Sequence, residues 1–128
     1  MKQLIFFTLL AVTFGCNKEI QKADLERVKG DFEWHHSHDG LFESIYSSTV
    51  SDKYGIRIKS RKKVSFYANS EKVLSLKINR IYQTQNGGTA IILQWTEHLE
   101  RAIIVEDNSL TFFDWPYGDF YNSFQRID

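Results

Sequence analysis

The stretch that decides the fold is residues 74–95, LSLKINRIYQTQNGGTAIILQW. Apolar and polar residues alternate on both sides of Asn86-Gly87, and this two-residue period is the pattern of half-buried strands. Asn-Gly suits the two positive φ values of a type I′ hairpin turn. The segment therefore predicts two antiparallel strands, with shared faces formed by Leu74, Leu76, Ile78 and Tyr82 and by Ile91, Leu93 and Trp95.

The same period extends outward from this hairpin, over residues 30–128. Residues 41–50 form a further extended run, and short polar turns are expected at 51–55, 61–63, 69–71, 107–109 and 116–118. Eight or nine strands result, with no amphipathic segment of helix length. Because short turns favour an up-and-down meander and closure removes exposed edges, we expect one all-β domain, a small antiparallel barrel.

Bulky residues are expected to point into this barrel. A barrel of about eight strands either fills its interior with side chains or holds one small ligand, and the sequence leaves both alternatives open. The inward candidates are Trp34, Leu76, Ile78, Ile91, Leu93, Trp95, Phe112 and Phe124.

Residues 1–15 have the composition of an export signal. Lys2 is followed by an apolar run over residues 4–14 and by Gly15, the pattern of a signal peptide. A membrane-spanning helix needs about 20 residues. The apolar run is shorter than that, so the segment predicts export and not a membrane-spanning helix.

Cys16 is the only cysteine, so an intramolecular disulfide is impossible and another use is expected. Residues 13–16 resemble a lipobox, in which the thiol accepts diacylglycerol after cleavage behind Gly15. Several acyl chains would hold the protein firmly to a membrane. Asn17 fits delivery to the outer membrane by analogy with enteric sorting, and either face of that membrane is possible. Residues 16–29 are then the lipidated cysteine and a polar tether with one or two helical turns.

The charge balance argues against one class of partner. The chain has 16 basic and 16 acidic side chains, and removal of Lys2 with the signal leaves 15 against 16, a balance of −1. Such a balance gives no support to nucleic-acid binding, and export argues against it further. We expect a monomer without a cofactor.

Several short motifs resemble those of small lipocalin-like lipoproteins from Bacteroidetes-type bacteria. They are the opening Gly30-Asp31-Phe32-Glu33-Trp34 and Ser37-His38-Asp39-Gly40, the strand Val64-Ser65-Phe66-Tyr67 with Asn69, and the ending from Leu110 to Ile127. The resemblance implies a lipocalin-like barrel behind a lipid anchor. It also implies a barrel-closing contact in which Arg126, from the last strand, packs on the first-strand ring of Phe32.

Three histidines and an aspartate follow one another at residues 35–39. On a regular strand His36 and His38 would share the face of Trp34. Two such imidazoles could bind a metal, with Asp39 or His98 as a further ligand. The alternative, which we favour, is a polar strand end without a metal.

A run of cations follows the next apolar strand. Arg57, Lys59 and Arg61 lie on one expected strand face, extended by Lys62 and Lys63. They could bind an anionic lipid headgroup, glycan or protein. The alternative, which we favour, is a solvated strand face whose cations oppose edge-to-edge aggregation.

Trp115 and Tyr117 lie in a predicted turn between Asp114 and Asp119. Exposed aromatic rings beside carboxylates can stack on sugars or bind a protein partner. The alternative, which we favour, is that the two rings fold back over one end of the barrel.

Catalysis has little support, because the chain has no nucleophile elbow, phosphate-binding glycine loop or zinc-protease helix. The leading hypothesis is a membrane-anchored, non-enzymatic lipocalin-like barrel that binds a small or apolar ligand. The alternative is a cell-envelope module that binds a protein or glycan through its loops or basic strand face. The ligand-binding candidates are Trp34, His36, Trp95, Trp115 and Tyr117.

Overall fold

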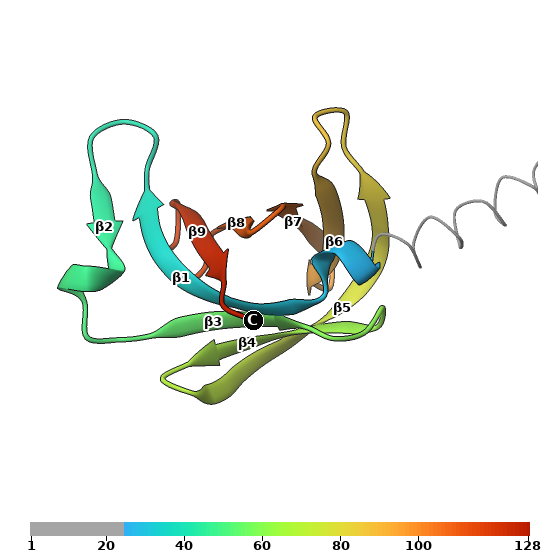
Figure 1. Ribbon diagram of the computed structural model, residues 1–128, viewed down its shortest axis with the longest axis horizontal. Helices are drawn as coiled ribbons and strands as arrows, with labels where there is room; N and C mark the ends of the chain where they lie inside the picture. Colours follow the sequence, from blue (N-terminus) through green and yellow to red (C-terminus); the bar gives the residue numbers. More distant parts are fainter. Residues whose placement is uncertain (1–24) are drawn as a thin grey trace, which may run out of the picture.

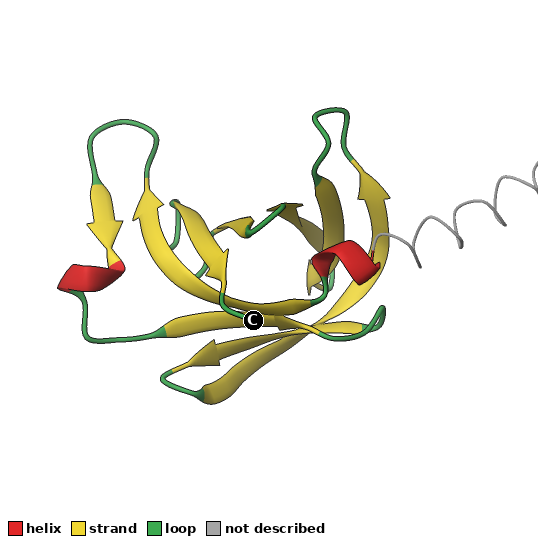
Figure 2. Ribbon diagram, in the orientation of Figure 1, coloured by secondary structure: helices red, strands yellow, loops and turns green. Residues whose placement is uncertain are grey.

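The computed structural model describes residues 25–128, and these form a closed barrel (Figures 1 and 2). Residues 25–28 form one helical turn before the first strand. The strands are β1 (Gly30–His38), β2 (Ser44–Tyr46), β3 (Tyr54–Ile58), β4 (Lys63–Ala68), β5 (Glu71–Gln83), β6 (Thr89–Thr96), β7 (Leu99–Glu106), β8 (Ser109–Phe113) and β9 (Tyr121–Arg126).

Eight of these strands close the barrel. All neighbouring strands are antiparallel, in the order β1-β3-β4-β5-β6-β7-β8-β9, and β9 pairs back with β1. The ninth strand, β2, pairs only with the end of β1. The expected all-β meander barrel is therefore confirmed.

The barrel has two distinct ends. The chain enters at one end, which we call the base, where Gly30 pairs with Ile58 and where the β3–β4, β5–β6 and β7–β8 turns and the C-terminus also lie. The opposite end, which we call the mouth, carries the β1–β2, β4–β5, β6–β7 and β8–β9 connections. In Figure 1 the β3–β4 and β5–β6 turns of the base lie on the right, and the β1–β2 and β4–β5 connections of the mouth lie on the left.

The middle of the barrel is filled with apolar side chains. Because a side chain without accessible surface cannot line a space that admits water, these residues leave no water-sized hollow around themselves. Seven of the eight predicted inward residues are buried, and Trp95 packs against them from a half-buried position. The largest fully buried residues include Phe32, Phe66, Phe112, Phe124, Ile56, Ile58, Ile91, Leu93, Ile103 and Leu110.

A bulge in β5 changes which side chains face inward. The pairing with β6 shifts by one residue between Ile78 and Arg80. As a result Ile81 is buried, whereas Tyr82, expected on the inward face, is 45% exposed on the outer wall. One extra residue reverses the face of every side chain that follows it.

The turn at Asn86-Gly87 differs from the expected type I′ geometry. Gly87 has a φ of 88°, but Asn86 is not among the residues with positive φ, and Gly87 N donates to Thr84 O. This is the geometry of a longer loop that ends on a left-handed glycine. Asn69 and Ser70, with φ values of 52° and 70°, supply the pair of positive angles at the β4–β5 turn.

The expected extended run over residues 41–50 is shorter in the structure. Only β2 is a strand there, and a 3-10 helix (Ser47–Thr49) follows it. Asp39 interrupts the extension, because its Oδ1 accepts hydrogen bonds from the backbone N–H groups of Leu41, Phe42 and Glu43. Such a local side-chain turn competes with strand pairing.

The base is closed by the segment that precedes β1. Val28 is fully buried in the core, so the last residues of the expected tether pack on the barrel. The guanidinium of Arg126 lies 4.6 Å from the ring centroid of Phe32. The same group donates to the backbone carbonyls of Lys29, Arg27 and Asp107. No helix within residues 25–128 is long and apolar enough to cross a membrane.

Candidate ligand site at the barrel mouth

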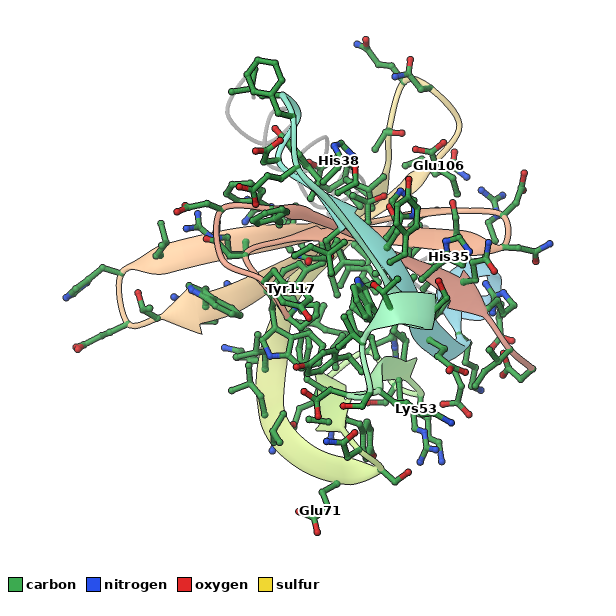
Figure 3. All side chains as sticks on the ribbon, turned by 90° about the vertical axis from the view of Figure 1, so that its left-hand side faces the viewer. His35, His38, Lys53, Glu71, Glu106 and Tyr117 are labelled. Atoms are coloured by element: carbon green, nitrogen blue, oxygen red, sulfur yellow. The ribbon has the colours of Figure 1, made fainter. Side chains whose placement is uncertain are left out.

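Aromatic rings from three parts of the chain meet at the mouth. Trp34 of β1 lies 5.4 Å from Tyr117 and 5.7 Å from Tyr54, measured between ring centroids. Tyr54 of β3 lies 5.6 Å from Trp115 and 6.1 Å from Tyr117. We call these four residues the mouth cluster. Figure 3 looks at this end, with Tyr117 toward the middle of the strands and Glu71 far out at the rim.

The mouth cluster rests directly on the core. Trp115 meets Phe66 edge-on at 5.1 Å and stacks on Phe124 at 6.2 Å. Beside it, Trp95 meets Phe112 at 5.6 Å. Edge-on and offset rings are favourable arrangements for aromatic pairs. The β8–β9 loop thus folds back over the barrel, which decides between the two alternatives for its aromatic residues.

A buried polar network holds this loop in place. Trp34 Nε1 donates to Ser37 Oγ at 2.8 Å, and Ser37 Oγ donates to Asn122 Oδ1 at 2.5 Å. Asn122 Nδ2 donates to the carbonyls of Phe112, Tyr117 and Phe120, each within 3.2 Å. Buried polar groups rigidify a site when all are paired. One amide therefore links β1, β8 and the loop that carries Trp115 and Tyr117.

Arg101 brings a charge to the mouth. In β7 it lies opposite Leu93, which is fully buried, and paired residues of antiparallel strands share a face. One terminal nitrogen donates to Asp114 Oδ2 at 2.9 Å, while the buried Nε has no hydrogen-bond partner. Arg101 is therefore the one described inward group with an unused buried donor, beside an otherwise aromatic surface.

The phenol of Tyr54 stays neutral over the physiological range. Burial raises its pKa above the usual value of 10.0, and the charge of Asp52 and the neighbouring phenol of Tyr117 raise it further. A neutral phenol keeps its hydroxyl proton available for donation. The mouth cluster therefore combines flat apolar rings with a few hydrogen-bonding groups, the composition of small-molecule sites.

His36, a predicted ligand-binding residue, lies outside the mouth. A bulge in β1 shifts the pairing with β9 between Trp34 and His36, so Ser37 takes the inward position that the alternation assigned to His36. The expectation that His36 and His38 share the face of Trp34 is therefore wrong. The cause is again a single extra residue in the strand.

On the outer wall the two histidines belong to a row of stacked rings, which we call the outer ladder. His36 stacks on Tyr46 at 5.8 Å and on His38 at 6.1 Å, and His38 stacks on Tyr121 at 5.4 Å. Partial burial, with His35 and His38 as lesser causes, lowers the pKa of His36 below 6.5. Within residues 25–128 no group of three or more His, Cys, Asp or Glu is placed to hold a metal ion.

The predicted basic strand face is divided in the structure. Arg57 pairs with Asp31 at 2.6 Å and lies 5.0 Å from the ring of Tyr67, so its charge is already neutralised. Arg57 and Asp31 line a groove of about 370 Å³ on the outer wall, beside Gly55. A separate group of cations remains at the base, formed by Lys59, Arg61, Lys62 and Lys63.

Sequence reasoning found part of this site. Trp34, Trp115 and Tyr117 are brought together, and Trp95 lies close by, on Phe112. Tyr54 was missed because it is the first residue of β3 and falls in the turn expected at residues 51–55. The alternation of apolar and polar residues is weakest at such a strand end. Asn122 and Arg101 were also missed, although alternation with Phe124 and with Ile103 places them at inward strand positions. Ser37 could not be found in this way, because only the bulge in β1 turns it inward.

Comparisons with protein-family models, with curated proteins and with solved structures find no match for this chain. The class of the protein therefore follows from its architecture: a small antiparallel β-barrel with a packed core and an aromatic mouth.

Proposed function

We propose that this chain is an exported lipoprotein, anchored to the outer membrane through Cys16, whose non-enzymatic barrel binds a small apolar ligand at its mouth. The proposal includes membership of the lipocalin-like lipoproteins that the sequence resembles. The observation that carries it is the mouth cluster, where Trp34, Tyr54, Trp115 and Tyr117 converge at one end.

The packing of the barrel argues for binding at the mouth and not deep inside. The core beneath Trp115 is filled by fully buried rings such as Phe66 and Phe124. By contrast, Tyr54, Trp95, Trp115 and Tyr117 are each half-buried. A flat or short apolar molecule could therefore stack on these rings without displacing the core.

Tryptophan fluorescence offers a direct test, because all three tryptophans of the chain, Trp34, Trp95 and Trp115, lie at or beside the mouth. Titration with anilinonaphthalene sulfonate should produce saturable probe fluorescence together with quenching of the tryptophans. Tyr117→Leu should weaken this binding about tenfold, because stacking on one ring is lost. A second titration with dodecanoate asks whether an alkyl chain competes with the probe.

Tyr82→Leu is the matched control, because Tyr82 is exposed on the outer wall. It should leave probe affinity unchanged. Because Tyr117→Leu could disturb the fold, Tyr117→Phe serves as a second variant that keeps the ring and should bind normally. Absence of saturable binding to the folded protein, or equal weakening by the Tyr82 variant, would overturn the ligand proposal.

The anchor is tested separately. Cells that express the full chain should incorporate radiolabelled palmitate into it, and Cys16→Ser should abolish both the label and retention in the outer-membrane fraction. The matched control combines Cys16→Ser with Ser109→Cys, which places a thiol at the exposed first residue of β8. This double variant should remain unlabelled. Labelling that survives Cys16→Ser would contradict lipidation at this residue.

The alternative, an envelope interaction module, has its own supporting observation. Leu41 and Phe42, at the tip of the β1–β2 hairpin, are 80% and 95% exposed, next to the outer ladder. Exposed apolar residues of this kind often mark contacts with another protein. Crosslinking in intact envelopes should then capture a partner that is lost with Phe42→Ser and kept with Tyr82→Ser.

A further inference from the structure

Five exposed cations gather on the base side of β3, β4 and β5. Within residues 25–128 none of their side chains takes part in an ion pair or a hydrogen bond, in contrast to Arg57, Arg80 and Arg101. We call this group the basic patch; its members are Lys59, Arg61, Lys62, Lys63 and Lys77.

Two members of the basic patch face each other directly. Lys63 of β4 is the cross-strand partner of Lys77 of β5. Like charges at opposite positions of paired strands repel each other and lower stability. The backbone holds this arrangement, because Ile78 N donates to Lys62 O at 2.8 Å. An anionic surface over the pair would relieve the repulsion.

The patch lies beside the point where the chain enters the barrel. Ile58, which precedes Lys59, pairs with Gly30, and Lys59 lines a surface hollow together with Glu26 and Lys29. Figure 1 shows the helical turn of residues 25–28 and the β3–β4 turn at the same end.

The length of chain before this point limits how far the base can be from an anchor. Nine residue steps separate Cys16 from Leu25. Fully extended, these span at most about 32 Å. A lipid on Cys16 would therefore keep the base, and with it the basic patch, within that distance of the bilayer.

We propose that the basic patch docks on anionic phospholipid headgroups of the bilayer that holds the lipid of Cys16. This inference rests on the proposed anchor and adds a second, electrostatic attachment, which a single-point tether lacks. The barrel would then stand base-down, with the mouth cluster at the far end, open to ligands.

Acidic groups of the base lie beside Lys59, where Glu26, Asp31 and Asp128 line the same hollow, and also at the β7–β8 turn. Glu106, Asp107 and Asp128 line a hollow beside the β7–β8 turn. An anionic bilayer repels these carboxylates while it attracts the basic patch. The barrel should therefore lean toward the β3–β4 turn and lift the β7–β8 turn away.

Proximity to lipid can be measured on the lipidated full chain. Since its one native cysteine carries the lipid, an introduced Ser60→Cys is the sole free thiol for a fluorophore in the β3–β4 turn. Vesicles of phosphatidylcholine, with and without phosphatidylglycerol, carry a trace of lipid with a nitroxide on its headgroup. Reference probes at Asn108→Cys and Ser70→Cys report on the β7–β8 turn and the mouth.

We expect strong quenching at position 60 only in vesicles with phosphatidylglycerol, weak quenching at 108 and none at 70. High salt should remove the quenching at position 60, because salt screens the attraction between exposed charges. Lys62→Gln with Lys63→Gln and Lys77→Gln should reduce quenching at 60 to its level in neutral vesicles. Lys53→Gln with Lys72→Gln, cations at the mouth end, should leave it unchanged.

Cosedimentation with neutral vesicles separates the two proposals. If the protein fails to sediment with phosphatidylcholine, the anchor itself is wrong. If it sediments but position 60 is no better quenched than position 70, or is quenched equally after the triple substitution, docking by the basic patch is overturned. That result would leave an acidic glycan or protein as the partner of these cations.

Discussion

Asn122 in β9 accepts the hydroxyl hydrogen bond of Ser37 in β1 at 2.5 Å, across the seam where the barrel closes. The same amide donates to three carbonyls of β8 and the β8–β9 loop. One side chain therefore connects the two strands that close the barrel to the loop that carries Trp115 and Tyr117.

Asn122→Ala should destabilise the protein by roughly 2–4 kcal/mol, because it leaves the Ser37 hydroxyl and several buried carbonyls unpaired. Urea unfolding followed by circular dichroism would measure the shift in midpoint. Asn108→Ala, in the exposed β7–β8 turn, should change stability by less than about 0.5 kcal/mol. Equal effects from the two variants would contradict the network.

Arg126→Lys should cost about 1–3 kcal/mol, although the charge is kept. The guanidinium lies over Phe32 and donates to three backbone carbonyls, and an ammonium cannot reproduce this planar arrangement. Arg61→Lys, on the exposed basic patch, is the matched control and should be neutral in the same urea experiment. A neutral Arg126→Lys would show that the base is held by other contacts.

Gly30→Ala should destabilise the barrel by about 1–3 kcal/mol. Gly30 has a φ of 150°, and a methyl group there would collide with the guanidinium of Arg126. At Gly118 the same substitution meets nothing within 4 Å, so Gly118→Ala should be tolerated. Thermal unfolding measures the melting temperature of each variant. Equal melting temperatures for Gly30→Ala and Gly118→Ala would contradict the prediction.

Acidification should weaken the fold in part through His36. Because the pKa of His36 is lowered in the folded state, the unfolded chain binds its proton first as the pH falls through 6.5. The contribution of His36 to the free energy of unfolding is therefore fully present above pH 6.5. It is lost as the pH falls from 6.5 toward the pKa of His36 in the folded state.

His36→Gln should therefore lose less stability than the native protein between pH 7 and pH 5, measured as the urea midpoint at each pH. Asn108→Ala, in the exposed β7–β8 turn, changes no titratable group and should follow the native curve. A His36→Gln curve parallel to the native one would contradict the role assigned to His36.

The strands were predictable because the alternation of apolar and polar residues is local. Leu76, Ile91, Leu93, Phe112 and Phe124 all face inward as expected. Faces were assigned wrongly only beyond bulges, at His36 in β1 and Tyr82 in β5. A bulge depends on how two strands pair and twist around a closed barrel, and neither strand alone records it.

By itself, then, the sequence determined an up-and-down order of eight or nine strands and the residues available for the core, since both follow from side-chain period and turn composition. Only the tertiary structure decided that Trp115 and Tyr117 fold over the mouth, that Asn122 holds them, and that Lys59 and its neighbours lie beside the chain entry. The physical reason is that these relations join strands far apart in the chain, and closure of the barrel sets which of them meet.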